Sequence, residues 1–138
     1  MLVHYAVRGR SDALSLAEKH ASLEDVALGN KIHDAVRLAN EGISLESALS
    51  VIGNDVTVYQ TVPLAFFLIY RIKDVTSLLT VAAHVGGNTD TIAFICGAYA
   101  GAVYGKTALP GDLLEGLEGK DEIESMAARL YERYTTKP

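Results

Sequence analysis

The chain has 138 residues, 49% of them hydrophobic, and a formal net charge of −5 from 12 basic and 17 acidic side chains. This length allows one compact domain with a single core, and we expect one domain over residues 1–138, with residues 135–138 as a tail. The acidic balance, without a basic stripe, excludes nucleic acid as the expected partner.

The cysteine content and the length of the apolar stretches indicate the cellular compartment of the protein. A lone Cys96 inside an apolar run excludes a disulfide framework and favours a reducing compartment. The longest apolar stretches, residues 62–70 and 92–104, are shorter than the roughly 18 to 20 residues that a membrane-spanning helix needs. No secretory signal pattern opens the chain. We therefore expect a cytoplasmic protein without a membrane segment.

Apolar residues at helical spacing, with capping residues between the runs, divide the chain into helices. The predicted N-caps are Ser11 with Asp12, Ser22, Ser44 and Asp74. We expect helices, in chain order, over residues 13 to about 20, 23–39, 45–52, 57–72, 75–84, 89–104 and 122–134. Gly42 ends the second helix, and Pro63 either kinks the fourth or marks its first turn. No segment alternates like a strand, so the predicted fold class is all-α.

The helix over residues 89–104 is unusually rich in glycine at a spacing of one helical turn. Gly97 and Gly101 lie in it, and Gly105 follows at the same interval. Each interior glycine costs about 1 kcal/mol relative to alanine, so the pattern needs a structural reason. We expect close approach of a neighbouring helix, and a tightly packed central helix would account for the pattern without any ligand.

The turn before this helix combines the glycine pair Gly86-Gly87 with three oxygen-bearing side chains, those of Asn88, Asp90 and Thr91. Glycines let a backbone approach a ligand closely, and Mg²⁺ takes oxygen ligands, often one or two carboxylates completed by water. Helix capping and the helix dipole explain the same three side chains without a metal. The residues alone leave both interpretations open.

The same segment resembles the C-terminal signature of the ADP-ribosylglycohydrolases, which include the dinitrogenase reductase-activating glycohydrolases. The resemblance rests on residues 86–93 and 97–102 and on Tyr104-Gly105, and it continues upstream through residues 42–49 and 61–70 in the family's order. It covers residues 22–134 approximately. It implies an all-α, orthogonal multi-helix domain like the C-terminal half of that family's fold.

The resemblance also implies a chemistry and a set of ligands. The family hydrolyses the glycosidic bond between ADP-ribose and an acceptor, with a pair of Mg²⁺ ions that orient ribose hydroxyls and activate or position water. By motif, Asn88, Asp90 and Thr91 correspond to the C-terminal metal ligands of this hydrolase site.

Substrate contacts are carried over in the same way. Gly86 and Gly87 correspond to the loop beside the ribose. Gln60 and Thr61 lie where the family places residues near the ligand, although a plain buried turn explains these two residues equally well. We take Gly86, Gly87 and Gln60 as the candidate substrate-binding residues.

Two features depart from the family's pattern. Asn88 stands where the family commonly has aspartate, so the site loses one negative charge and weaker metal binding is expected. The family also draws a Thr-Asp-Asp ligand cluster from an N-terminal half, and this chain contains no Asp-Asp dipeptide. Half of the expected metal site is missing.

We therefore interpret the chain, which starts apolar at residues 1–5, as the C-terminal half of a larger fold: a split or truncated product, a fragment, or a protein that self-associates. Its first candidate function is part of an Mg²⁺-dependent ADP-ribosyl hydrolase, inactive until a partner supplies the missing ligands. The alternative is a non-catalytic binding or assembly module that keeps the fold. The expected partners are ADP-ribose or an ADP-ribosylated substrate, and a homo-oligomer or a heteromer with an N-terminal-half partner.

Overall fold

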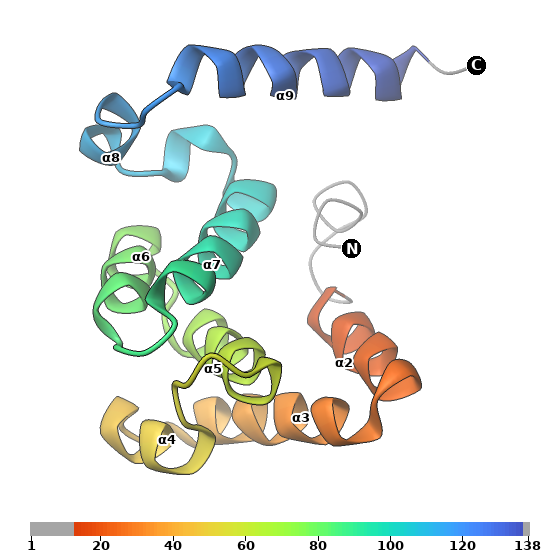
Figure 1. The fold of residues 1–138 in the computed structure, drawn as a ribbon, viewed down its shortest axis with the longest axis vertical. Coiled ribbons are helices and arrows are strands. Elements are labelled where there is room, and N and C mark those ends of the chain that lie inside the picture. Colours follow the sequence, from red (N-terminus) through yellow and green to blue (C-terminus); the bar gives the residue numbers. More distant parts are fainter. Residues whose placement is uncertain (1–12, 137–138) are drawn as a thin grey trace. The chain divides into compact units, whose positions relative to one another are not determined.

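The structure is a computed structural model that describes residues 13–136. Its helices, in chain order, are α2 (Ala13–Glu24), α3 (Val26–Glu41), α4 (Leu45–Ile52), α5 (Val58–Arg71), α6 (Val75–His84), α7 (Thr89–Tyr104), the 3₁₀ helix η2 (Lys106–Ala108), α8 (Gly111–Glu115) and α9 (Lys120–Thr135) (Figure 1). No strand occurs between residues 13 and 136, and the all-α prediction is confirmed. The chain divides into two compact units, Met1–Ala108 and Leu109–Pro138, so the single domain stays a prediction.

Helix α5 is the centre of the first unit because it contacts α3, α4, α6 and α7. Leu64, Ala65 and Leu68 of this helix are completely buried, as expected for a segment that is apolar almost all round. Pro63 lies inside α5 and is also buried, so it does not mark the first turn. The buried helix predicted over residues 57–72 is confirmed, with Val58–Arg71 as its bounds.

The boundary between α2 and α3 differs from the prediction. Asp25, not Ser22, is the N-cap of α3, and its carboxylate accepts the backbone N–H groups of Ala27 at 2.8 Å and Leu28 at 3.1 Å. Ser22 lies inside α2, where its hydroxyl donates to the carbonyl of Glu18 at 2.9 Å. The prediction of Ser22 as a cap is wrong because its hydroxyl is turned back into its own helix.

The other helix boundaries follow the predicted caps. The side chains of Ser44 and Asp74 each accept a backbone N–H from the first turn of α4 and α6. Gly42 ends α3 in the left-handed conformation, with φ of 75°. Ser11 and Asp12, the remaining predicted caps, lie outside the described residues.

The glycine spacing in and after α7 predicts close packing of a neighbouring helix at Gly97, Gly101 and Gly105. A Cβ atom added at Gly97 would lie in ordinary contact, 3.6 Å from Leu79, and one added at Gly101 would meet no described atom within 4 Å. Gly105 is the C-cap of α7, beyond the helix itself. For Gly101 and Gly105 the prediction is therefore wrong within the described part of the chain.

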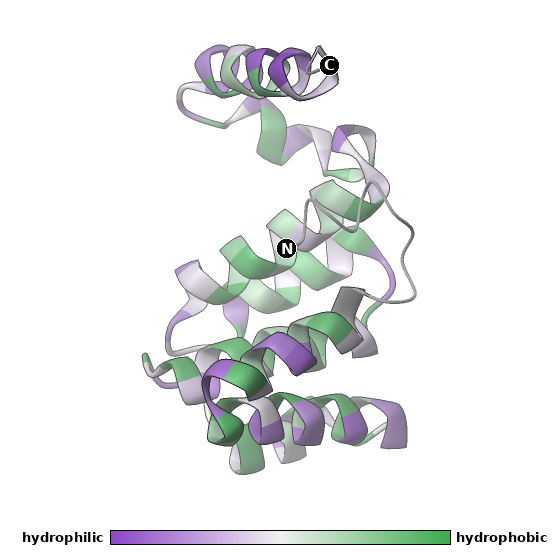
Figure 2. Ribbon diagram, turned by 90° about the vertical axis from the view of Figure 1, so that its right-hand side faces the viewer, coloured by the Kyte–Doolittle hydropathy of each residue, from purple (hydrophilic) through white to green (hydrophobic). Residues whose placement is uncertain are grey.

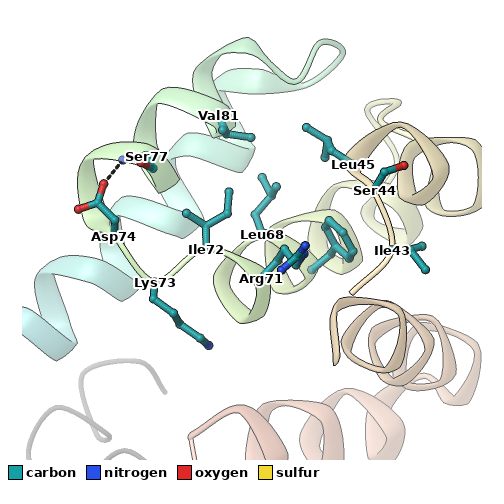
Figure 3. Close-up of a pocket in the computed structure, with 11 residues that line it drawn as sticks. Ile43, Ser44, Leu45, Leu68, Arg71, Ile72, Lys73, Asp74, Ser77 and Val81 are labelled. Carbon is teal, nitrogen blue, oxygen red and sulfur yellow. Dashed lines mark hydrogen bonds between the residues drawn. The ribbon is translucent and has the colours of Figure 1, made fainter. Parts of the chain in front are cut away.

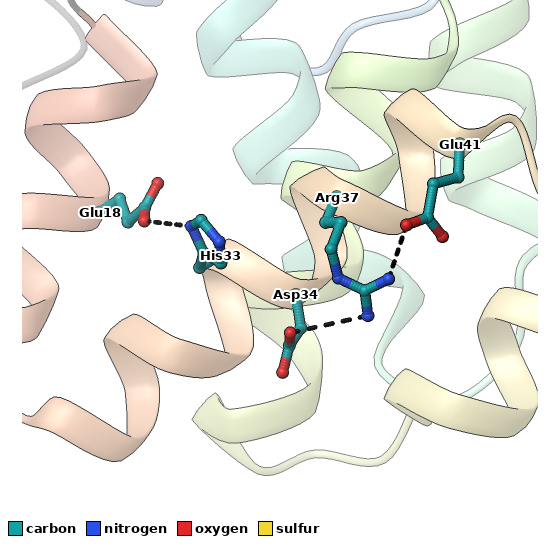
Figure 4. A network of polar contacts seen from close by, with 5 residues as sticks. All are labelled: Glu18, His33, Asp34, Arg37 and Glu41. Atoms are coloured by element: carbon teal, nitrogen blue, oxygen red, sulfur yellow. Dashed lines mark hydrogen bonds and ion pairs between the residues drawn. The ribbon is translucent and has the colours of Figure 1, made fainter.

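Exposed ion pairs lie along α2 and α3 (Figure 4). The Nδ1 atom of His33 lies 2.7 Å from the carboxylate of Glu18, which joins the two helices. Arg37 lies 2.7 Å from Glu41 and 3.7 Å from Asp34, all within α3. Exposed pairs of this kind contribute about 0 to 1 kcal/mol, so the apolar core around α5 holds the unit together.

The second unit contains α8 and α9, and α9 begins two residues before its predicted start and includes Thr135 of the predicted tail. Its apolar side chains recur at helical spacing, and polar residues alternate with them along the ribbon (Figure 2). The large apolar side chains of this helix are all exposed: Ile123, Met126, Leu130, Tyr131 and Tyr134. Within residues 13–136, no helix is long and apolar enough to cross a membrane.

Candidate metal site

The predicted ligand Asn88 is the N-cap residue of α7, but its side chain does not cap the helix. Its Oδ1 atom accepts a hydrogen bond from the hydroxyl of Thr91 at 2.9 Å. Its Nδ2 group donates to the hydroxyl oxygen of Thr61 in α5 at 3.2 Å. The interpretation of Asn88 as a capping side chain is wrong, because both ends of its amide bind other side chains.

The other two predicted ligands, Asp90 and Thr91, lie two and three positions after Asn88, in the first turn of α7. Asp90 is exposed, and its Oδ1 atom accepts the backbone N–H of Thr91 at 2.8 Å. The N-terminal end of a helix favours a negative charge at this position. Capping therefore accounts for the contact of Asp90, while the contact between Asn88 and Thr91 needs another explanation.

The glycine pair before α7 brings this turn against the loop at residues 53–55. Gly86 and Gly87 have φ of 82° and 65°, and a Cβ atom on Gly87 would lie 1.7 Å from the carbonyl oxygen of Asn54. That carbonyl accepts the backbone N–H of Asn88 at 3.1 Å. The side-chain amide of Asn54 donates to the carbonyl of Val85 at 3.1 Å. In the structure the glycines serve this approach of two backbones, and their contact with a substrate stays a prediction.

The loop at residues 53–55 is also held by the start of α5. The side-chain oxygen of Gln60 accepts the backbone N–H of Asp55 at 2.8 Å, and the hydroxyl of Thr61 donates to the carbonyl of Asp55 at 3.0 Å. A Cβ atom on Gly53 would lie 2.3 Å from the oxygen of Gln60. The role of Gln60 as a substrate contact stays a prediction, and its place beside the Asn88 turn is what the structure adds.

The six candidate residues therefore lie on one connected network of hydrogen bonds and close contacts. Sequence reasoning missed Asn54 and Asp55, which join the α5 residues to the turn before α7. Their only signal was the triplet Gly53-Asn54-Asp55, which reads as an ordinary turn. Their contacts run between segments that are distant in the chain, so no local pattern could have shown them.

The sequence profile described as ADP-ribosylglycohydrolase matches residues 1–138. The chain belongs to the ADP-ribosylglycohydrolase family. This match is longer than the resemblance noted from the motifs alone, since it includes the residues before Ser22.

Known relatives agree with the family assignment. The chain is 37% identical over 108 residues to an uncharacterised protein of Archaeoglobus fulgidus. The aligned segment covers 77% of this chain and 35% of that protein. It is 30% identical over 128 residues to ADP-ribosylhydrolase ARH3 of Danio rerio, and this segment covers 84% of the chain and 35% of that relative. With human ADP-ribosylhydrolase ARH3 it shares 29% identity over 105 residues, covering 68% and 29%. No solved structure matches the chain.

Length separates this chain from those relatives. It spans about a third of the length of the curated relatives it matches.

The oxygens of this ADP-ribosylglycohydrolase segment suit a hard divalent cation. One carboxylate from Asp90, one amide oxygen from Asn88 and one hydroxyl from Thr91 come from a single helical turn, and Mg²⁺ prefers oxygen ligands of these kinds. Among the described residues, no group of three His, Cys, Asp or Glu side chains could hold a metal by itself. The donor set therefore fits one side of a metal site, with a single charged ligand.

Cys96 takes no part in this cluster. It is completely buried in α7, and its sulfur lies 4.0 Å from the carbonyl oxygen of Ala65 in α5. Burial raises the pKa of the Cys96 thiol to about 12, so the thiol stays protonated at neutral pH and packs as an apolar group.

A cavity of about 460 Å³ lies at the other end of α5 from the Asn88 cluster (Figure 3). Phe67, Leu68 and Arg71 line it from the last turns of α5, while Thr61 contacts the cluster from the first turns. The cavity and the candidate metal site are thus separate features of the first unit.

Proposed function

We propose that this chain supplies one side of an Mg²⁺-dependent ADP-ribosylglycohydrolase site. The reaction is hydrolysis of the glycosidic bond that joins ADP-ribose to an acceptor, and the remaining ligands come from a partner or an N-terminal half. The single observation that carries the proposal is the Asn88, Asp90 and Thr91 cluster, in which the amide of Asn88 is committed to Thr61 and Thr91 instead of capping α7.

Each side chain of the cluster has a distinct part in the proposal. Asp90 provides the one negative charge of the cluster, from the first turn of α7, and this charge would attract a cation. Asn88 and Thr91 provide neutral oxygens on the same turn. Bound Mg²⁺ would supply Lewis-acid chemistry and a template for ribose hydroxyls and water.

The substrate contacts of the proposal come from the residues around the cluster. The backbone of Gly86 and Gly87 directly precedes the ligands, and this stretch of backbone would lie beside the ribose of the substrate. Gln60 lies on the same network through Asp55, and its side-chain nitrogen would meet the substrate. Because Asn88 is neutral, we expect metal affinity below that of a site with aspartate at this position.

A magnesium titration followed by nuclear magnetic resonance tests the proposal on the chain as it exists. We expect Mg²⁺, and then ADP-ribose, to shift the backbone signals of residues 86–91 in the unaltered protein. Asp90→Asn should weaken the Mg²⁺ response by about tenfold or more, because the one charged ligand is lost.

Glu46→Gln is the matched control. Glu46 has the same position in the first turn of α4 that Asp90 has in α7, and it is likewise exposed, so both variants lose a charge near a helix N-terminus. The control should leave the Mg²⁺ response unchanged. Absence of any Mg²⁺ response in the unaltered protein, or equal loss in both variants, would refute the metal site.

The second candidate, a non-catalytic binding or assembly module, is favoured by the single carboxylate of the cluster and by the absence of a three-residue metal group among the described residues. The same titration distinguishes the two. ADP-ribose binding that depends on Mg²⁺ and is lost in Asp90→Asn supports the hydrolase site. ADP-ribose binding that is equal with and without Mg²⁺ supports the module.

A further inference from the structure

The buried hydroxyl of Thr61 is the starting point. Apart from Tyr99 and Cys96, it is the one buried side chain with a polar group among those that the structure describes, at 2% exposure. A hydroxyl has one proton to donate and can also accept, and a buried hydroxyl without partners is costly. Thr61 has a partner on each side: the backbone carbonyl of Asp55 at 3.0 Å and the side chain of Asn88 at 3.2 Å.

The direction of these two bonds follows from their chemistry. The carbonyl oxygen of Asp55 can only accept, so the single proton of the Thr61 hydroxyl is used there. Thr61 can therefore only accept from residue 88. An asparagine NH₂ group can donate this proton, whereas an ionised aspartate has none to give.

The same reasoning sets the orientation of the Asn88 amide. Its NH₂ group faces Thr61, so its oxygen faces Thr91, whose hydroxyl donates to it at 2.9 Å. A cation is held by the amide oxygen and repelled by the NH₂ group. The Thr61 hydroxyl donates its hydrogen bond to the Asp55 carbonyl, so it can only accept from Asn88. This is why Asn88 presents its oxygen, and not its NH₂ group, beside Asp90 and Thr91.

We propose that Thr61 is a positioning residue that fixes the Asn88 amide with its oxygen toward the metal site, and that this hydroxyl is why residue 88 is asparagine. The metal's part in this inference rests on the proposed function. The orientation of the amide does not, and it can be measured without any metal.

The first test is Thr61→Val, which keeps the shape of the side chain and removes the hydroxyl. Metal-free, we expect the side-chain NH₂ signals of Asn88 to move in the nuclear magnetic resonance spectrum and their hydrogens to exchange faster with water. With Mn²⁺ as the probe, we expect affinity to fall by about tenfold or more, as for other groups that orient a metal ligand. Thr61→Ser should restore both readouts because it keeps the hydroxyl.

Thr57→Val is the matched control for this substitution. Thr57 precedes α5 and its side chain makes no capping hydrogen bond, so loss of its hydroxyl should leave the Asn88 signals and Mn²⁺ affinity unchanged. Unmoved Asn88 signals in a folded Thr61→Val protein would overturn the inference. Moved Asn88 signals in a protein that never binds Mn²⁺ would refute the proposed function and leave the positioning role intact.

A second test asks whether the Thr61 hydroxyl and residue 88 form a matched pair, in which Thr61 requires a hydrogen-bond donor at position 88. Asn88→Asp places two acceptors around one Thr61 proton, so we expect the midpoint of thermal unfolding of the metal-free protein to fall by roughly 5 °C or more. In the T61V background the same substitution should cost less than half as much, since the competition for the proton is gone. An equal loss in both backgrounds would contradict the matched pair, whatever the metal affinity.

Discussion

Gly87 and Gly101 lie just before α7 and inside it, and the surroundings of these two residues are opposite. A Cβ atom on Gly87 would lie 1.7 Å from the carbonyl oxygen of Asn54, and its φ of 65° is strained for any other residue. A Cβ atom on Gly101 would meet no described atom within 4 Å, and its backbone is helical. The first glycine is required by the candidate metal site, whereas the second only weakens its helix.

Alanine at these two positions should therefore change stability in opposite directions. Gly87→Ala should lower the free energy of unfolding by at least about 2 kcal/mol, because the left-handed backbone and the contact with Asn54 are both penalised. Gly101→Ala should raise it by about 0.5 to 1 kcal/mol through helix propensity. Urea unfolding followed by circular dichroism measures both. Destabilisation by Gly101→Ala would instead revive the close helix packing expected from the glycine spacing.

At the scale of helices, one carboxylate joins the start of α3 to the start of α5. One oxygen of Asp25 caps α3 through the N–H groups of Ala27 and Leu28, and the other accepts the hydroxyl of Tyr59. The Tyr59 hydroxyl, together with the Leu28 N–H, lowers the pKa of Asp25 below its ordinary value of 3.8. Because the folded pKa is the lower one, this contact stabilises the fold above pH 3.8 and loses its effect as the pH falls through the folded value.

Removal of the Tyr59 hydroxyl should expose this pH dependence. In Tyr59→Phe the pKa of Asp25 should rise toward its ordinary value, and the protein should be less stable than the unaltered one at neutral pH. The difference should shrink once Asp25 is protonated in both proteins, below the folded pKa. Carboxyl resonances and unfolding at several pH values measure this. Tyr131→Phe, at an exposed position on α9, is the control and should change neither quantity.

The helices of the first unit could be predicted because their signals are local. Ser44 and Asp74 cap the helices that their spacing predicts, and the apolar character of residues 57–72 predicts burial. The prediction that Ser22 caps α3 is wrong because Asp25, three residues later, offers a charged acceptor to two N–H groups at once. Choosing between two nearby caps requires knowing where α2 ends, and that depends on packing.

The candidate metal site likewise has a part that the sequence could predict and a part that it could not. Gly86, Gly87, Asn88, Asp90 and Thr91 form one short motif, so the sequence could place them together. The partners of Asn88 could not be predicted, because Thr61 lies 27 residues earlier and Asn54 lies earlier still. Contacts of that kind are decided by how α5 packs against α7, which no local spacing encodes.

At the scale of the whole molecule, the second unit carries several large apolar side chains along one face of α9. Leu130 and Tyr131 of α9 are 71% and 69% exposed, and Met126 is 55% exposed one turn earlier. Burying a single large apolar side chain contributes about 1.5 to 3 kcal/mol, so several together favour association. Self-association or a heteromer, expected from the sequence, stays a prediction, and α9 is the surface that supports it.

Sedimentation velocity at micromolar concentration tests this prediction. We expect a species heavier than the 14.8 kDa monomer, because the α9 face is removed from water in an oligomer. Leu130→Glu places a charge in that face and should shift the protein toward the monomer. Ser125→Glu adds the same charge to the opposite side of α9 and should leave the distribution unchanged. A clean monomer for the unaltered chain, or equal shifts in both variants, would show that the apolar face of α9 does not drive self-association.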